Sequence, residues 1–98
     1  MALEIKWSKK ADRNFDSIIA YLKGEFGETT TSNFVRKVHE FLDLLCEFPE
    51  LGTEENKDLN IRGFVIVKQV TIFYKIRSQK IILLNFYDNR QRPKKKRF

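Results

Sequence analysis

The sequence predicts one α+β domain with the element order β-α-α-β-β-β, in which a helical hairpin covers one face of an antiparallel sheet. Three observations predict this fold. Residues 2–7 alternate apolar and polar side chains, two longer segments carry apolar residues at helical spacing, and three short segments rich in β-branched and aromatic residues follow. A chain of 98 residues can bury a core without disulfides or metals. We expect the domain to span residues 1–93 and a basic tail to occupy residues 94–98.

The first predicted strand is the alternating segment at the start of the chain. Within residues 2–7, Leu3, Ile5 and Trp7 share one face, which is the pattern of a half-buried strand. Ser8 follows directly and offers a side-chain oxygen to cap a helix. Because the helices separate this strand from the other three, we expect it to join one edge of the sheet.

Two amphipathic helices are predicted next. Their apolar positions are Ala11, Phe15, Ile18, Ile19, Leu22 and Phe26 in the first helix and Phe34, Val38, Phe41, Leu42 and Leu45 in the second. Gly24 and Gly27 are expected to end the first helix, and residues 29–32 supply caps for the second. Pro49 and Gly52 stop the second helix. A connection this short predicts an antiparallel hairpin with both apolar stripes facing the sheet.

Three further strands are predicted over Ile61–Val67, Val70–Ile76 and Ile81–Tyr87. The connections between them are long enough only for hairpins, so the strands should form an antiparallel meander. Residues 50–60, which precede the meander, contain few apolar and several acidic side chains. We therefore expect an exposed acidic loop there.

The positive charge of the chain is concentrated at its end. Of nineteen Lys and Arg residues, six lie in residues 88–98, against Asp88 alone, so this segment accounts for +5 of the net charge of +6. The six are Arg90, Arg92, Lys94, Lys95, Lys96 and Arg97. Such an arm attracts polyanions, either nucleic acid or an acidic protein segment, with a strength that falls as salt rises.

Several classes of function are excluded. The only candidates for a soft-metal site are Cys46 and His39, too few for structural zinc, and the four glycines form no phosphate-binding loop. His39 is also the only base available to a catalytic triad. We expect no cofactor and no metal. One cysteine and the lack of a long apolar segment predict a cytoplasmic protein with no membrane partner.

What remains is a set of basic and aromatic side chains on and after the strands. It consists of Arg62, Lys68, Tyr74, Lys75, Tyr87, Arg90 and Arg92. Arg62 opens one strand and Arg90 follows the end of another, so the two can converge to hold phosphate. Metal-free RNA cleavage also needs an acid and a base. Near the chain's end only Tyr87 and Asp88 are candidates, and both residue types ordinarily ionise far from neutral pH. Tyr74, in mid-strand, is expected to be a packing residue.

The chain resembles small toxins of the RelE/ParE superfamily from bacterial type II toxin–antitoxin modules. The resemblance spans nearly the whole chain and is carried, in order, by five segments. These are Trp7–Ala11, Leu44–Gly52, Ile61–Arg62, Phe73–Ile76 and Phe86–Pro93. It implies a compact sheet with a helical hairpin packed on it, and a cognate antitoxin as partner.

The superfamily divides by mechanism, and the resemblance leaves both branches open. ParE-like members inhibit DNA gyrase, whereas RelE-like members enter the ribosome and cut mRNA. The long helices and the Phe48–Gly52 segment resemble the ParE side, and Thr71 stands where cleaving members typically carry an arginine. The sequence thus favours a ParE-like toxin, with a ribosome-dependent endoribonuclease as the alternative. A non-catalytic nucleic-acid-binding module is a further alternative, and a homodimer or a toxin–antitoxin hetero-oligomer stays open.

The site residues that the resemblance implies are few. Arg62 matches the family's arginine on the strand after the loop, Arg90 its C-terminal arginine, and Tyr87 a C-terminal acid or base. These three would be catalytic in a ribonuclease. In either mechanism the residues expected to bind nucleic acid or another target are Arg62, Lys68, Arg90, Arg92, Lys94, Lys95 and Lys96.

Overall fold

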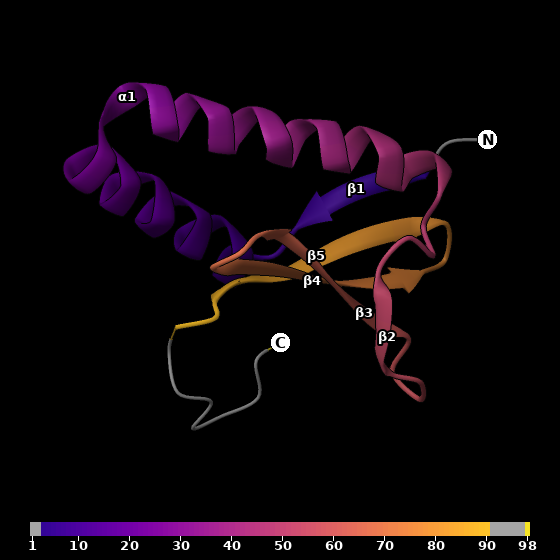
Figure 1. Cartoon of the computed structure of the whole chain (residues 1–98). Coiled ribbons are helices and arrows are strands. Elements are labelled where there is room, and N and C mark those ends of the chain that lie inside the picture. Colours follow the sequence, from indigo (N-terminus) through magenta and orange to yellow (C-terminus); the bar gives the residue numbers. More distant parts are fainter. Residues whose placement is uncertain (1–2, 91–97) are drawn as a thin grey trace.

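The computed structural model describes residues 3–90 and 98, and it contains one long helix against one sheet (Figure 1). The elements, in chain order, are β1 (Glu4–Trp7), α1 (Lys9–Glu47), β2 (Thr53–Asn56), β3 (Ile61–Val67), β4 (Val70–Arg77) and β5 (Lys80–Asp88). The strands form a five-stranded sheet in the order β1-β5-β4-β3-β2. This confirms the predicted α+β class and the three predicted strands of the meander.

The direction of β1 differs from the prediction. β3, β4 and β5 pair antiparallel as expected, but β1 pairs parallel with β5, with Ile5 opposite Ile81, so the sheet is mixed. The expectation of a wholly antiparallel sheet is therefore wrong. The prediction that β1 joins an edge is confirmed. Side-chain alternation reports that a segment is a strand but not the direction of its partner, and α1 carries the chain far enough to allow the parallel arrangement.

The predicted acidic loop contains a strand. β2 lies within residues 50–60 and pairs antiparallel with β3, with Thr53 opposite Gly63 and Glu54 opposite Arg62. The expectation of a loop throughout this segment is wrong. β2 is a short, charged edge strand, a kind that limits association between sheets and lacks the apolar alternation by which strands are recognised.

The two predicted helices form a single element with a break. α1 runs without a connecting loop, but Gly27 has φ 85° and ψ −177°, which is far from helical, and Figure 1 shows the chain reversing there. Ser8 caps the start as predicted, since its side chain accepts from the Ala11 amide at 3.0 Å. The expected capping by residues 29–32 takes another form, because the Thr31 hydroxyl donates to the Gly27 carbonyl at 2.8 Å. This bond spans four residues and lies within the first turn after the break.

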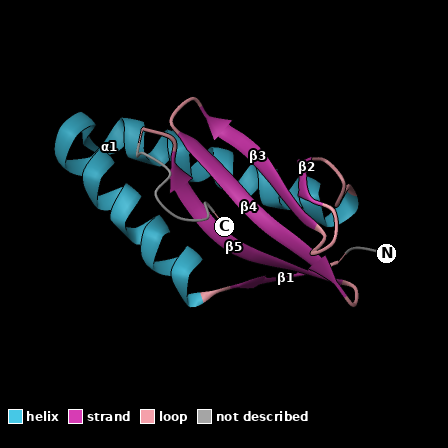
Figure 2. Cartoon of the chain, turned by 90° about the horizontal axis from the view of Figure 1, so that it is seen from below, coloured by secondary structure: helices cyan, strands magenta, loops and turns pink. Residues whose placement is uncertain are grey.

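The core lies between α1 and one face of the sheet. It is rich in large side chains, namely Phe34, Val38, Phe41, Leu42 and Leu45 from α1 and Ile72, Tyr74, Ile81, Leu83 and Phe86 from β4 and β5. Trp7 of β1 stacks on Phe86 with ring centroids 5.2 Å apart. The opposite face of the sheet, called the open face below, is turned toward the viewer in Figure 2 and carries no helix in the described part of the chain.

Candidate functional site

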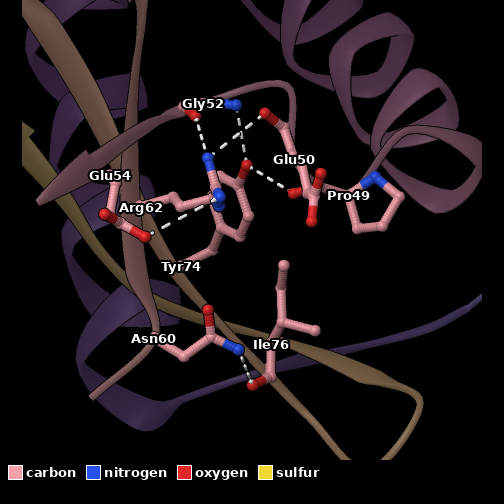
Figure 3. A network of polar contacts seen from close by, with 8 residues as sticks. All are labelled: Pro49, Glu50, Gly52, Glu54, Asn60, Arg62, Tyr74 and Ile76. Atoms are coloured by element: carbon pink, nitrogen blue, oxygen red, sulfur yellow. Dashed lines mark hydrogen bonds and ion pairs between the residues drawn. The ribbon is translucent and has the colours of Figure 1, made fainter. Parts of the chain in front are cut away.

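Arg62 and Tyr74 lie side by side on the α1 side of the sheet, beneath the turn that follows α1 (Figure 3). The Tyr74 hydroxyl donates to the Pro49 carbonyl and accepts from the Gly52 amide, both at 2.8 Å. Tyr74 is fully buried, which confirms its predicted packing role, and this burial raises the pKa of its phenol. The network therefore fixes the turn from below.

Arg62 holds the same turn from the side. Its guanidinium donates to the Gly52 carbonyl at 2.8 Å and to the Glu50 carbonyl at 3.3 Å, and Nη2 lies 4.0 Å from the Glu54 carboxylate. The side chain is only 18% exposed, and its buried Nε has no hydrogen-bond partner among the described residues. The guanidinium of Arg62 thus binds mainly to backbone carbonyls of its own chain.

Glycine at position 52 allows this close packing. A Cβ there would lie 2.8 Å from the Gly63 carbonyl oxygen and 2.8 Å from the Tyr74 hydroxyl. These distances are too short for any side chain, so the turn can approach the sheet only at a glycine. The Phe48–Gly52 segment contributed to the family resemblance. Its packing on Arg62 and Tyr74 explains why it ends in glycine.

A second polar cluster lies beyond the end of β5, where Arg90 binds Asp88 and Tyr21. Arg90 forms a two-bond ion pair with the Asp88 carboxylate, at 3.0 Å from Nε and 2.7 Å from Nη2. Its Nη1 donates to the Tyr21 hydroxyl at 3.0 Å, and the guanidinium carbon lies 4.9 Å from the Tyr21 ring centroid. This geometry combines a hydrogen bond with a cation–π contact. It ties the end of β5 to the first arm of α1.

The electrostatics of this cluster follow from the same contacts. The hydrogen bond from the Arg90 side chain lowers the pKa of Asp88, and the bonds to Asp88 and Tyr21 raise the pKa of Arg90. Asp88 therefore remains ionised and Arg90 remains cationic near neutral pH. In this state Asp88 is not a proton donor.

The turn between β3 and β4 lies at the same end of the sheet. The backbone amide of Asn89 donates to the Gln69 carbonyl at 2.7 Å, and its side-chain amide donates to the Lys68 carbonyl at 3.4 Å. The Thr71 hydroxyl donates to the Asn89 side chain at 2.9 Å. Lys68 and Arg90 are thus brought to one end of the sheet, and both are exposed.

Arg62 and Arg90 do not converge, so that expectation is wrong. β3 and β5 both run antiparallel to β4, so the start of β3 and the end of β5 lie at opposite ends of the sheet. Arg62 is level with Tyr74 and Leu83, and the five residues from Leu83 to Asp88 span roughly 16 Å. One phosphate group cannot bridge the two arginines.

The remaining predicted residues fall in three places. Tyr87 lies half-buried opposite Thr71, with its ring 6.3 Å from that of Phe73, on the open face. Lys75 is on the same face and half-buried. Arg92, Lys94, Lys95 and Lys96 lie outside the described residues. Tyr21 was not among the predicted site residues, because its only signal is an aromatic side chain off the apolar stripe of its helix.

The described residues contain neither a metal-binding cluster nor a membrane-spanning helix. No group of three or more His, Cys, Asp or Glu side chains among residues 3–90 and 98 could hold a metal. Within the same residues, α1 is the only helix, and it has no stretch apolar enough to span a membrane.

Several solved structures share the fold, among them the following three. A chain of the chromosomal ParDE TA system from P. aeruginosa matches with a TM-score of 0.73 and 16% sequence identity, over 89% of this chain and 96% of that one. The YoeB dimer from Staphylococcus aureus matches with a TM-score of 0.64 and 16% identity, over 88% and 95%. A conserved hypothetical protein from Helicobacter pylori gives 0.59 and 18%, over 91% and 97%. At these identities the likeness shows the fold alone.

The mixed sheet covered on one face by a broken helix defines the class as a RelE/ParE-like α+β fold. The family model described as the ParE toxin of type II toxin–antitoxin system, parDE, matches residues 5–93. The chain belongs to the ParE toxin family and is the toxin component of a type II toxin–antitoxin system within the RelE/ParE superfamily. Membership implies a cognate antitoxin as partner. A search of curated protein sequences finds no match.

Proposed function

We propose that this toxin arrests bacterial growth as a ParE-like inhibitor of DNA gyrase, without catalysis of its own, and that its cognate antitoxin neutralises it. The observation that carries the proposal is the match of residues 5–93 to the ParE toxin model. The competing mechanism is RelE-like, ribosome-dependent cleavage of mRNA.

The geometry of the polar residues supports the non-catalytic mechanism. Metal-free RNA cleavage needs a proton donor, a base and a cation around one phosphate. Arg62 is bound beneath the turn after α1, about 16 Å along the sheet from Asp88, and Asp88 is held ionised by Arg90. Tyr87 then remains as the proton-transferring group of the ribonuclease hypothesis, on the face of the sheet opposite Arg62.

The end of the sheet that carries Lys68 and Arg90 is the proposed target-binding region. Both residues are exposed, and three of the five guanidinium N–H groups of Arg90 donate to Asp88 and Tyr21, which orients the group and keeps it charged. The positively charged Arg92, Lys94, Lys95 and Lys96 follow in sequence. A cationic surface of this kind favours association with an acidic protein surface or with DNA held by an enzyme.

A supercoiling assay with purified toxin and gyrase tests the proposal. We expect loss of supercoiling or trapped cleaved DNA, and we expect Lys68→Glu to weaken the effect because it reverses an exposed charge in the proposed region. Arg36→Glu is the matched control, since Arg36 is also exposed but lies on α1 and bonds only to Asn33 among the described residues. Intact gyrase activity together with mRNA cut on ribosomes would refute the proposal in favour of the ribonuclease.

The cationic tail also bears on the antitoxin. An antitoxin segment with acidic residues would neutralise this end of the toxin, and its affinity should then fall as salt rises. Deleting residues 94–98 should weaken the complex and flatten its salt dependence, as measured by calorimetric titration at two ionic strengths. Unchanged affinity after the deletion would show that the tail does not contribute.

A further inference from the structure

The open face of the sheet carries a buried aromatic side chain, Phe73. In β4 it alternates with Ile72 and Tyr74, which belong to the α1-side core, so Phe73 points to the opposite face. It is nevertheless 0% exposed. The absence of a side chain at Gly63 on β3 makes room for its ring, because a Cβ at that position would lie 2.9 Å from a ring carbon of Phe73. The ring of Phe73 therefore packs closely against the backbone of β3 at Gly63.

Two other aromatic rings contact Phe73. The ring of Tyr87 on β5 lies 6.3 Å away at 69°, and the ring of Phe98, the last residue of the chain, lies 5.7 Å away at 55°. Both arrangements fall within the range of favourable aromatic pairs. Figures 1 and 2 agree in placing the last residue, marked C, on the side of the sheet away from α1.

The surface beside Phe73 is concave. A hollow of about 400 Å³ opens there, lined by Leu51 and Val65 among others, and Thr71 and Phe73 form part of its wall. Other large aromatic side chains, such as Phe26 and Phe48, are 59% and 58% exposed, whereas Phe98 is half-buried. The last residue of the chain is thus better covered than Phe26 of α1 and Phe48 at its C-cap.

We propose that Phe73 and Tyr87 form a seat for an aromatic side chain on the open face, and that the chain's own C-terminal Phe98 occupies this seat. The seat links the end of the chain, where the sequence concentrates its positive charge, to the sheet. The inference does not depend on which target the toxin has, because the contacts that carry it lie within the chain.

The seat is exchangeable. Holding Phe98 in place closes a loop after Arg90, and the conformational entropy lost in closing a short loop is similar in size to the gain from partly burying one phenyl ring. An aromatic side chain presented by a partner at the open face would therefore compete with Phe98 for Phe73 and Tyr87.

A single tryptophan placed at position 98 tests the seat. The chain has one tryptophan, so the double variant Trp7→Phe/Phe98→Trp reports on position 98 alone. The matched control is Trp7→Phe/Phe26→Trp, which places the reporter at an exposed position on α1. We expect quenching by acrylamide to be several-fold weaker at position 98 than at position 26, with a blue-shifted emission. Equal quenching at the two positions in folded protein would overturn the proposal.

Removal of the seat provides the second arm of the test. Phe73→Leu, added to the position-98 reporter, should raise quenching to the level of the control while circular dichroism shows that the fold persists. If Phe73→Leu unfolds the chain, Tyr87→Leu at a half-buried position replaces it. Protection at position 98 should also persist in about 1 M salt, where screening shortens electrostatic range to about 3 Å. Protection that survives the loss of the tested ring in folded protein, or that salt abolishes, would show that the aromatic contact does not hold the chain's end.

Discussion

Removing one hydroxyl group, in Tyr74→Phe, tests the network beneath the turn after α1. The hydroxyl makes two hydrogen bonds of 2.8 Å, to the Pro49 carbonyl and from the Gly52 amide, in a region where Tyr74 and Gly52 are buried. The substitution keeps the ring but leaves both backbone groups without this partner. Each lost bond to a buried group costs about 1–2 kcal/mol, so we expect a free energy of unfolding lower by about 2–4 kcal/mol.

Urea denaturation measures this loss. With an m-value of about 1–1.5 kcal/mol/M for a chain of this size, the midpoint should fall by about 2 M while the m-value stays constant. Amide exchange at Gly52 should accelerate in parallel. Tyr21→Phe is the matched control, because Tyr21 is 41% exposed and gives up one hydrogen bond to Arg90, and we expect it to cost less than about 1 kcal/mol. If Tyr74→Phe and Tyr21→Phe destabilise equally, the hydroxyl of Tyr74 does not hold the turn.

Three further predictions concern the glycines and pH. Gly27→Ala should lower the free energy of unfolding by about 1–3 kcal/mol, because φ 85° with ψ −177° is a conformation for glycine alone. Gly24→Ala, in the helical part of α1, should instead raise the free energy of unfolding by about 0.5–1 kcal/mol. Thermal denaturation of the two variants should show a lower melting temperature for the first and a higher one for the second. Gly63→Ala should cost about 1–3 kcal/mol in the same assay, since its Cβ must displace the buried ring of Phe73. Burial raises the pKa of Tyr74, so its neutral form contributes stability that is complete below the unfolded-state pKa of about 10 and is lost as pH rises through the folded-state pKa. The difference in stability between wild type and Tyr74→Phe, measured by urea denaturation, should therefore shrink above about pH 10, and a constant difference would contradict this.

The parts of the fold that could be predicted are those set by local chemistry. Ser8 caps α1 because a serine oxygen satisfies an amide three residues on, which only the nearby sequence determines. β3, with bounds Ile61–Val67 as predicted, is equally local, since β-branched and aromatic residues fit a pleated surface. The parallel direction of β1 and the strand character of β2 depend on partners far along the chain. The pattern of apolar and polar residues in segments 2–7 and 50–60 does not indicate which strand each pairs with or in which direction.

The candidate site shows the same division. The residue types at positions 62, 68, 87 and 90 could be selected from the sequence, because cations and phenols at strand ends are suited to phosphate chemistry. Their mutual placement could not, because it depends on the register of three strands. Lys68 and Arg90 lie at one end of the sheet, while Arg62 lies at the other.

The role of Arg62 also determines how its variants should be interpreted. Its guanidinium donates to the carbonyls of Glu50 and Gly52, so Arg62→Ala removes two hydrogen bonds to the turn, one of them at the buried Gly52, whatever the toxin's target. Loss of toxicity in Arg62→Ala therefore does not by itself identify a target contact. A contact is identified only if a variant at this position loses inhibition while its urea midpoint and the amide exchange of Gly52 stay at wild-type values. Lys68 is the more informative position, because its side chain is exposed and its substitution leaves the turn after α1 intact.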